Sequence, residues 1–218
     1  MPVIKKTVLS DQIIDVLRKR VIAGGFDIGA PIRQDALAAE LGVSKIPLRE
    51  AFAKLEQEGL IVSHANRGYF VSPLSLEEAL DVLDLRLKLE PSANAEASAR
   101  LEHGDIQAAR GALARLEEAM AASDPSAGEF NREFHVYLAR PCHRPVTLQI
   151  IERLHVLSER YVVRHQESRG AARTSAEHRE LFEAWAAGQS ERAEALAAQH
   201  ILGTRDDLVR ELRPAGTT

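Results

Sequence analysis

The chain has 218 residues, of which 45% are hydrophobic and 28% are charged, the balance of an ordinary globular protein. Its one cysteine, Cys142, excludes a disulfide framework and a cysteine-rich zinc module, and is typical of a reducing cytoplasm. Apolar runs fall well short of the roughly 18 residues of a membrane span, and the N-terminus does not resemble a signal peptide. Averaged over the whole chain, the net charge of −4 argues against nucleic-acid binding.

The charge is unevenly distributed along the chain. Residues 1–72 hold ten Lys and Arg against eight Asp and Glu, a net charge of +2. The remaining residues hold eighteen against twenty-four, a net charge of −6, and they are rich in Ala, Leu and Glu. Because Pro73 breaks the chain where the composition changes, the sequence predicts two domains, residues 1–73 and 74–218.

Three helices and a hairpin are expected in the first domain. Ser10 is a candidate cap for the first helix, Gly42 ends the second, and Ser44 is a candidate cap for the third. The expected helices span about 10–23, 33–41 and 44–58. Two short apolar runs, 60–63 and 69–72, enclose an Asn and a Gly, which predicts a β-hairpin. The order of these elements is that of a winged helix-turn-helix.

Helical spacing continues through the second domain. Gly or Pro stands at each break, and Pro91 is expected to kink the first long helix or remove one of its hydrogen bonds. The expected helices span about 75–101, 104–122, 127–140, 146–167, 174–187 and 190–211. The predicted fold class is therefore mainly α, with an N-terminal winged helix-turn-helix and a C-terminal all-α bundle.

The start of the third helix has the features of a DNA-reading element. The major groove admits one helix, whose N-terminal side chains reach the base edges. Lys45, Ile46 and Arg49 are expected to point away from the core, and the helix start at Ser44 suits a phosphate. Residues placed to hold the DNA backbone are Arg33, His64, Asn66 and Arg67. Each basic residue alone would be an ordinary solvated charge, but together they indicate double-stranded DNA as a partner.

The stretch PIRQDALAAELGVSKIPLREAFAKLEQEGLIVSHANRGYFVSP resembles the DNA-binding domain of GntR-family bacterial transcription regulators, over roughly residues 8–73. The resemblance implies DNA contacts by Arg33, Ser44, Lys45, Arg49 and the wing pair Arg67-Gly68. Many relatives have Arg in place of Lys45, and since Lys lacks the bidentate fork that fits guanine, a phosphate contact is favoured here. Ile46 stands where Thr or Ser is common, which exchanges a polar contact for an apolar one.

The helical domain contains three histidines of particular interest. His135 follows Asn131 by four residues, so both share one helical face, while His178 and His200 lie on later helices. They can meet only if their helices are neighbours, and bundle cores are a usual place for metal sites. The alternative for each is a hydrogen-bonded histidine without a metal. His103 and His143 are expected in loops, and His155 and His165 at a surface or an interface.

Residues 75–210 resemble the FCD ligand-binding domain of the FadR subfamily of GntR regulators, and six helices resemble its VanR-type branch. The matching stretches are Arg86…Leu89-Glu90-Pro91, Asn131-x-x-x-His135, Glu177-His178 and Gln199-His200. The resemblance implies a divalent metal ion, with zinc, nickel and manganese all open. Its implied ligands are Asn131, His135, His178 and His200.

Neutral ligands would leave the dipositive charge of the ion intact, which suits an anionic effector. Arg86 is the candidate second clamp for an effector carboxylate. Its alternative is an ion pair with Glu90, four residues further on, on the helix surface.

These expectations describe a cytoplasmic, homodimeric transcription regulator rather than an enzyme. It binds a pseudo-palindromic operator and responds to a small organic acid, without a role at a membrane. Two alternatives from other classes are a metal-dependent hydrolase built on the histidines and a constitutive architectural DNA binder. Turnover by metal-loaded protein would favour the first alternative, and operator affinity insensitive to chelators and organic acids would favour the second.

Overall fold

The computed structural model describes residues 7–169 and 171–212, with side chains over residues 9–161 and 173–211. The chain divides into two compact units between Pro73 and Leu74. Each unit is described by itself. In the described part of the chain, no helix combines the length and the apolar character needed to cross a membrane.

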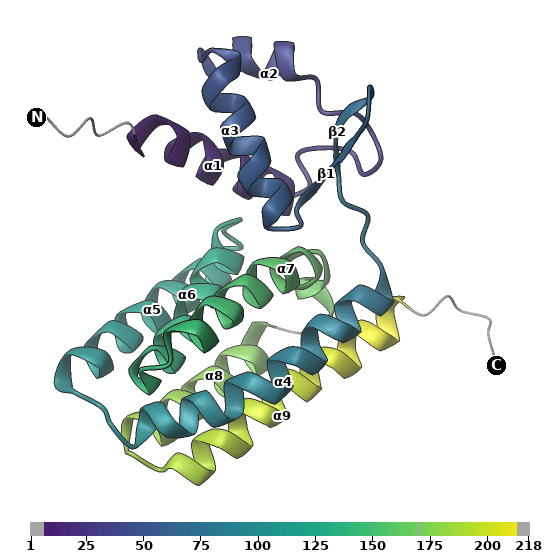
Figure 1. The fold of residues 1–218 in the computed structure, drawn as a ribbon. Helices are drawn as coiled ribbons and strands as arrows, with labels where there is room; N and C mark the ends of the chain where they lie inside the picture. Colours follow the sequence, from purple (N-terminus) through teal and green to yellow (C-terminus); the bar gives the residue numbers. More distant parts are fainter. Residues whose placement is uncertain (1–6, 170, 213–218) are drawn as a thin grey trace, which may run out of the picture. The chain divides into compact units, whose positions relative to one another are not determined.

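The N-terminal unit consists of three helices followed by a hairpin (Figure 1). Its elements are α1 (Thr7–Ile22), α2 (Gln34–Leu41), α3 (Lys45–Gln57), β1 (Ile61–His64) and β2 (Gly68–Val71). The two strands are antiparallel, with Ile61 opposite Val71 and His64 opposite Gly68. This order confirms the predicted winged helix-turn-helix.

The core of this unit forms where α1 packs on α3. Leu17 of α1 and Leu48 and Leu55 of α3 are fully buried together with Leu60. Between α2 and α3, Gly42 adopts a left-handed conformation with φ of 64°, and its N–H bonds back to the last turn of α2. A glycine suits this conformation because it has no Cβ to clash. After this tight turn, α3 packs one face on the core and leaves Lys45, Ile46 and Arg49 exposed to solvent.

The two predicted serine caps differ from the structure. α1 already begins at Thr7, so Ser10 lies inside the helix; no Gly or Pro stands between Thr7 and Ser10 to stop it. Ser44 does precede α3 in an extended conformation, but its side chain makes no capping hydrogen bond. The third residue of that helix is Pro47, which has no N–H to donate to a serine cap.

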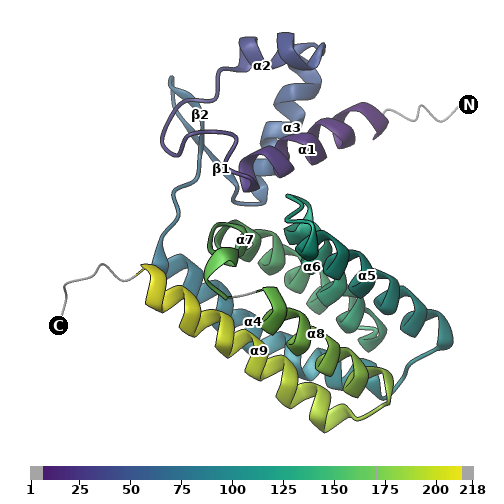
Figure 2. The same cartoon turned by 180° about the vertical axis from the view of Figure 1, so that it is seen from behind.

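The C-terminal unit is a bundle, and its described residues form six α-helices and one short 3₁₀ turn (Figure 2). They are α4 (Leu76–Ser98), α5 (His103–Ala121), α6 (Ala127–Ala139), the turn η1 (Arg140–Cys142), α7 (Pro145–Arg169), α8 (Ala171–Ala186) and α9 (Ser190–Leu212). The long helix α4 packs along α9 and also against α7 and α6. α4 continues through Pro91 as one helix and is capped by Ser75, whose Oγ accepts from the Glu78 N–H.

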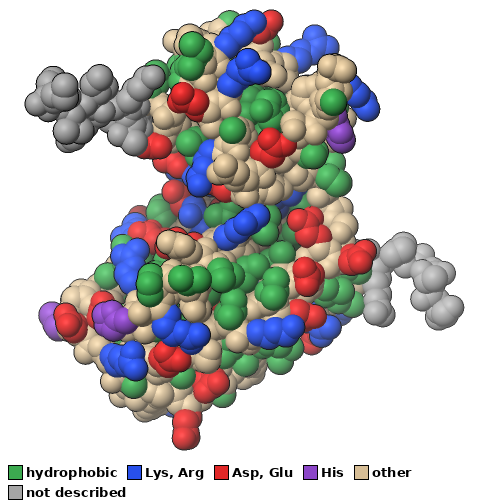
Figure 3. All heavy atoms as spheres, viewed as in Figure 1, with side chains coloured by type: hydrophobic (Ala, Val, Ile, Leu, Met, Phe, Trp, Pro, Cys, Tyr) green, Lys and Arg blue, Asp and Glu red, His purple; other side chains and the backbone are tan. Residues whose placement is uncertain are grey.

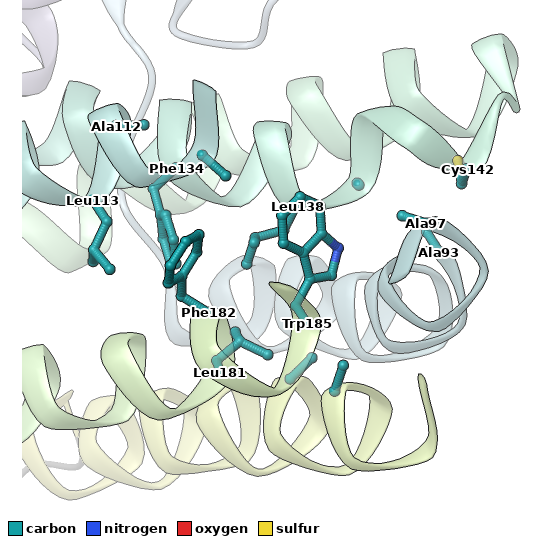
Figure 4. Close-up of a cluster of buried hydrophobic side chains, with 14 of the residues drawn as sticks. Ala93, Ala97, Ala112, Leu113, Phe134, Leu138, Cys142, Leu181, Phe182 and Trp185 are labelled. Carbon is teal, nitrogen blue, oxygen red and sulfur yellow. The ribbon is translucent and has the colours of Figure 1, made fainter. Parts of the chain in front are cut away.

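The main apolar core of the bundle lies among α4, α5, α6, α8 and α9, and α7 contributes Ile151. Figure 4 shows Phe134 and Leu138 of α6 meeting Phe182 and Trp185 of α8. Alanines such as Ala93 and Ala97 allow α4 to approach this cluster closely. The core fixes the helices that carry His135 and His178, because Phe134 and Phe182 lie on the same two helices.

Candidate DNA-binding element and metal centre

The residues predicted to read DNA lie on the exposed side of α3. Ser44, Lys45, Ile46 and Arg49 are all exposed, whereas Leu48, between them in sequence, is fully buried. Lys45 Nζ lies 2.6 Å from Asp35 Oδ1 of α2, and both side chains are largely exposed. An exposed pair of this kind contributes little to stability, so Lys45 can exchange Asp35 for a phosphate at small cost. The start of α3 therefore presents exposed polar groups to a ligand.

The predicted backbone-holding residues are exposed as well. Arg33 immediately precedes α2, and His64, Asn66 and Arg67 lie at the tip of the hairpin. Asn66 and Gly68 both have positive φ, 60° and 88°, which makes the turn between the strands tight. The Arg67 guanidinium lies over the Phe70 ring at 5.4 Å, so the wing arginine is anchored while remaining exposed.

Positive side chains are prominent at one end of this unit. Figure 3 shows Lys and Arg at the end where α2 and the start of α3 lie. This agrees with the net charge of +2 over residues 1–72. Basic residues beside a helix start give the electrostatic footprint that DNA phosphates require.

Three buried histidines come together in the bundle from three different helices. They are His135 of α6, His178 of α8 and His200 of α9, and their ligand nitrogens lie within 4.8 Å of one another. The ring centroids of His178 and His200 are 4.6 Å apart, and that of His135 lies 5.2 Å from His178 and 5.1 Å from His200. Imidazoles gathered in this way are a donor set for a divalent transition metal.

The environment of these histidines fits metal ligation. His135 Nε2 is buried and has no hydrogen-bond partner among the described residues. Burial lowers the pKa of His135 well below its usual value, and the neighbouring His155, His200 and His178 lower it further. The ring is therefore neutral and offers a lone pair, the state in which histidine binds a metal.

His200 is oriented by a carboxylate. Its Nδ1 lies 3.0 Å from Glu177 Oε2, and because a carboxylate only accepts hydrogen bonds, this nitrogen carries the ring hydrogen. The lone pair is then on Nε2. A carboxylate behind a ligating histidine in this manner fixes the tautomer and raises the basicity of the ligand nitrogen.

Asn131 is half-buried on α6, one turn before His135. The i, i+4 spacing places both side chains on one face of the helix. The membership of Asn131 in the ligand set stays a prediction.

A second buried polar group adjoins the histidine cluster. Arg86 Nε donates to Glu90 Oε1 at 2.5 Å, and Arg86 also donates to Glu90 Oε2 and to Ser158 Oγ. Glu90 Oε1 lies 3.1 Å from Nε2 of His155, whose ring stacks on that of His135 at 5.0 Å. The expected i, i+4 pair of Arg86 and Glu90 therefore exists, but it is buried rather than on the helix surface.

The sequence prediction for His155 was wrong. Its side chain is 1% exposed, not at a surface, because it shares the inner face of α7 with the buried Ile151 and Ser158. The sequence signal that could have placed His155 inside is its i, i+4, i+7 spacing with Ile151 and Ser158. The side chain of His165 lies outside the described residues. His143 is exposed just after η1, as expected of a loop residue, whereas His103 is exposed but begins α5.

The charges around Glu90 explain why this second group differs from the first. Burial alone would raise the pKa of Glu90, but the Arg86 guanidinium and His155 outweigh it and hold the pKa well below its usual range. Burial also lowers the pKa of His155, and Arg86 lowers it further. Glu90, His135 and His155 could by distance hold a cation, but the adjacent guanidinium repels a second positive ion. Glu90 and His155 are better suited to holding the ring of His135 in position, since the His155 ring stacks on it.

The geometry thus defines a class of protein: a regulator with a DNA-binding winged helix and a helical sensor domain. Comparison with known proteins agrees. Residues 9–71 match the family of bacterial regulatory proteins called gntR, and residues 81–203 match the FCD domain, more than half of the chain. The chain belongs to the GntR family with an FCD domain and is a DNA-binding transcription regulator.

Proteins similar in sequence to this chain are also described as transcription regulators. It is 31% identical over 151 residues to the HTH-type transcriptional repressor GlaR of Escherichia coli, covering 66% of this chain and 68% of that protein. It is 25% identical over 197 residues to a probable D-xylose utilization operon transcriptional repressor of Paenarthrobacter nicotinovorans, covering 90% of this chain and 87% of that one. Escherichia coli McbR/YncC has the same fold, with a TM-score of 0.80 at 22% identity, over 94% of this chain and 99% of that one.

Proposed function

We propose that this regulator binds its operator as a homodimer and releases or tightens it when a small organic acid binds beside a divalent metal ion. The observation that carries the proposal is the buried cluster of His135, His178 and His200 inside the FCD domain. Three imidazoles from three different helices meet at one buried point, which is a donor set that a divalent ion fits.

The protein groups prepare this cluster for a metal and an anion. Glu177 sets the tautomer of His200, and burial keeps His135 neutral. With Asn131 as a fourth neutral ligand, the ion would keep its dipositive charge and attract a carboxylate as a Lewis acid. Zinc, nickel and manganese are all compatible with an imidazole-rich donor set.

Arg86 is positioned to assist in holding the effector. Three of its N–H groups are used by Glu90 and Ser158. A guanidinium has five N–H hydrogens. The two that remain can donate to the two oxygens of an effector carboxylate without Arg86 leaving Glu90. In this proposal Glu90 holds the arginine, and the arginine holds the effector.

A second copy of the chain would complete the DNA-binding unit. The bundle exposes large apolar side chains on α4, α7 and α9, among them Val146 and Ile150, one turn apart on α7. Val146 and Ile150 share one face of α7, and neighbouring exposed apolar side chains are candidates for a protein–protein contact. Two copies present two recognition helices, which would fit half-sites about one turn of DNA apart.

The test uses full-length protein purified without chelators. We expect elemental analysis to find about one divalent ion per chain in the wild type and none in the double variant His135→Ala/His200→Ala. The control His143→Ala changes an exposed histidine and should keep its ion. Unchanged metal content in the double variant would show that the cluster is not the site.

Operator affinity supplies the second readout. Fluorescence anisotropy with a selected operator duplex should shift when a panel of small mono-, di- and tricarboxylates is added to metal-loaded wild type. A coupling of about 1–3 kcal/mol between the two sites is usual for such regulators. Affinity that ignores every acid in the panel would leave the DNA-binding assignment intact and contradict the proposed effector class.

A further inference from the structure

The outer face of α3 carries one large apolar side chain among polar ones. Ile46 is 69% exposed, more than any other large hydrophobic side chain among the described residues. Lys45, Arg49 and Glu50, which lie next to it in sequence or one helical turn away, are exposed as well. The described residues of its own unit leave most of this isoleucine uncovered.

Helical spacing fixes the direction of Ile46. Ile46 and Arg49 are three residues apart and share a face, while Leu48 and Ala51 point into the core. Ile46 therefore projects from the first turn of α3, beside Arg49 and away from the rest of the unit. The N-terminal turn of a recognition helix is the part that enters the major groove.

The chemistry of Ile46 selects its partner in the groove. An isoleucine neither donates nor accepts a hydrogen bond, so it cannot read the polar edge of a base. The thymine C5-methyl is the apolar group that base pairs present in the major groove. A protein partner fits this surface less well, because charged side chains such as Lys45 and Arg49 surround Ile46, and charged residues are depleted in the cores of protein interfaces.

We propose that Ile46 packs against a thymine methyl in each operator half-site and so specifies T·A at that position. The proposal rests on the proposed function, in which α3 enters the major groove of an operator. It adds a base preference that the charged residues of α3 do not supply. Lys45 and Arg49 flank the contact and hold phosphate or neighbouring bases.

The experiment removes only the methyl group from the DNA. An operator is first selected from random duplexes with the full-length protein, and each thymine of a half-site is then replaced in turn by deoxyuridine. Loss of one buried methyl-sized contact is worth about fourfold in affinity. We expect one position per half-site with about this loss, and about a 15-fold loss when both half-sites are changed.

Variants connect that position to Ile46. In Ile46→Ala, the thymine and deoxyuridine duplexes should bind equally, because the partner of the methyl is gone. The matched control Ile28→Ala makes the same change at another exposed isoleucine of the unit, outside α3, and should retain the full deoxyuridine penalty. Thermal unfolding checks that both variants fold as the wild type does.

The two hypotheses fail differently. A wild type that binds its selected operator tightly, yet shows the same deoxyuridine profile as Ile46→Ala, overturns the thymine contact and leaves operator binding standing. A wild type that selects no operator sequence overturns both the thymine contact and the proposed function.

Discussion

The two units of the chain keep their candidate functional residues in opposite environments. In the winged helix, Lys45, Ile46 and Arg49 are exposed, and Lys45 is held only by the exposed Asp35. In the bundle, Arg86 and the three clustered histidines are buried. DNA binds at a protein surface, whereas the proposed metal and small acid would be enclosed within the bundle.

In the winged helix, a substitution at the candidate site should change binding without changing stability. In the bundle, such a substitution should change both. Exposed side chains make few contacts within the fold, so their removal changes binding and leaves the free energy of unfolding nearly unchanged. A buried charge depends on its partner, so its removal changes both. The whole-chain net charge of −4 conceals this division, since it is the sum of +2 in one unit and −6 in the other.

The largest effect on stability is expected in the bundle, from Arg86→Ala. The substitution leaves the buried Glu90 carboxylate without its guanidinium. Breaking such a pair costs about 3–5 kcal/mol. Thermal unfolding would detect this as a fall of about 6–20 °C in Tm. The double variant Arg86→Ala/Glu90→Gln removes the uncompensated charge and should recover part of the loss.

A surface control accompanies that measurement. Arg144 pairs with Glu96, and both side chains are nearly half exposed. We expect Arg144→Ala to change stability by no more than about 0.5 kcal/mol. Equal effects of Arg86→Ala and Arg144→Ala would contradict the assignment of the Arg86–Glu90 pair as a buried structural element.

In the winged helix, Arg49→Ala should show the opposite behaviour. Removing an arginine that contacts a base costs about 1–3 kcal/mol of DNA-binding free energy per half-site, and a dimer loses this twice. Footprinting should show no protected operator, while circular dichroism and Tm match the wild type. Protection at wild-type affinity would exclude Arg49 from the recognition surface.

Metal removal is expected to have an intermediate effect on the bundle. A ligand present at 100 times its Kd stabilises the folded state by about 2.7 kcal/mol. Chelation should therefore lower the Tm of wild type by about 5–11 °C. The same treatment should leave His135→Ala/His200→Ala unchanged, because that variant has no ion to lose. A wild type whose Tm ignores the chelator would contradict a structural contribution of the metal.

The sequence predicted the elements whose signals are local. Gly42 and the Asn66–Gly68 turn marked the helix-turn-helix and the wing, and the structure confirms both. Ser44 shows the limit of local signals. A serine before a helix suggests a cap, but Pro47 removes the N–H that the third helical residue would donate.

The polar interior of the bundle was only partly predictable. The spacing of Asn131 and His135 placed them on one face, but no local pattern shows that His178 and His200 of other helices reach the same point. His155 was missed because its partner, Glu90, is 65 positions away on another helix, and only packing brings the two together. Polar residues on an inner face stay ambiguous until their partners are known.

Asn131→Asp is expected to have the smallest effect and tests the electrostatics of the metal site. A carboxylate in place of the amide adds a negative charge beside the histidines, and ligand charge is one of the factors that tune metal affinity. We expect about tenfold tighter metal binding, which is 1.4 kcal/mol, together with weaker binding of anionic effectors. The two changes must have opposite signs, because the same charge attracts the cation and repels the acid. Calorimetry that finds neither change would remove Asn131 from the ligand set and leave the three histidines as the protein's own donors.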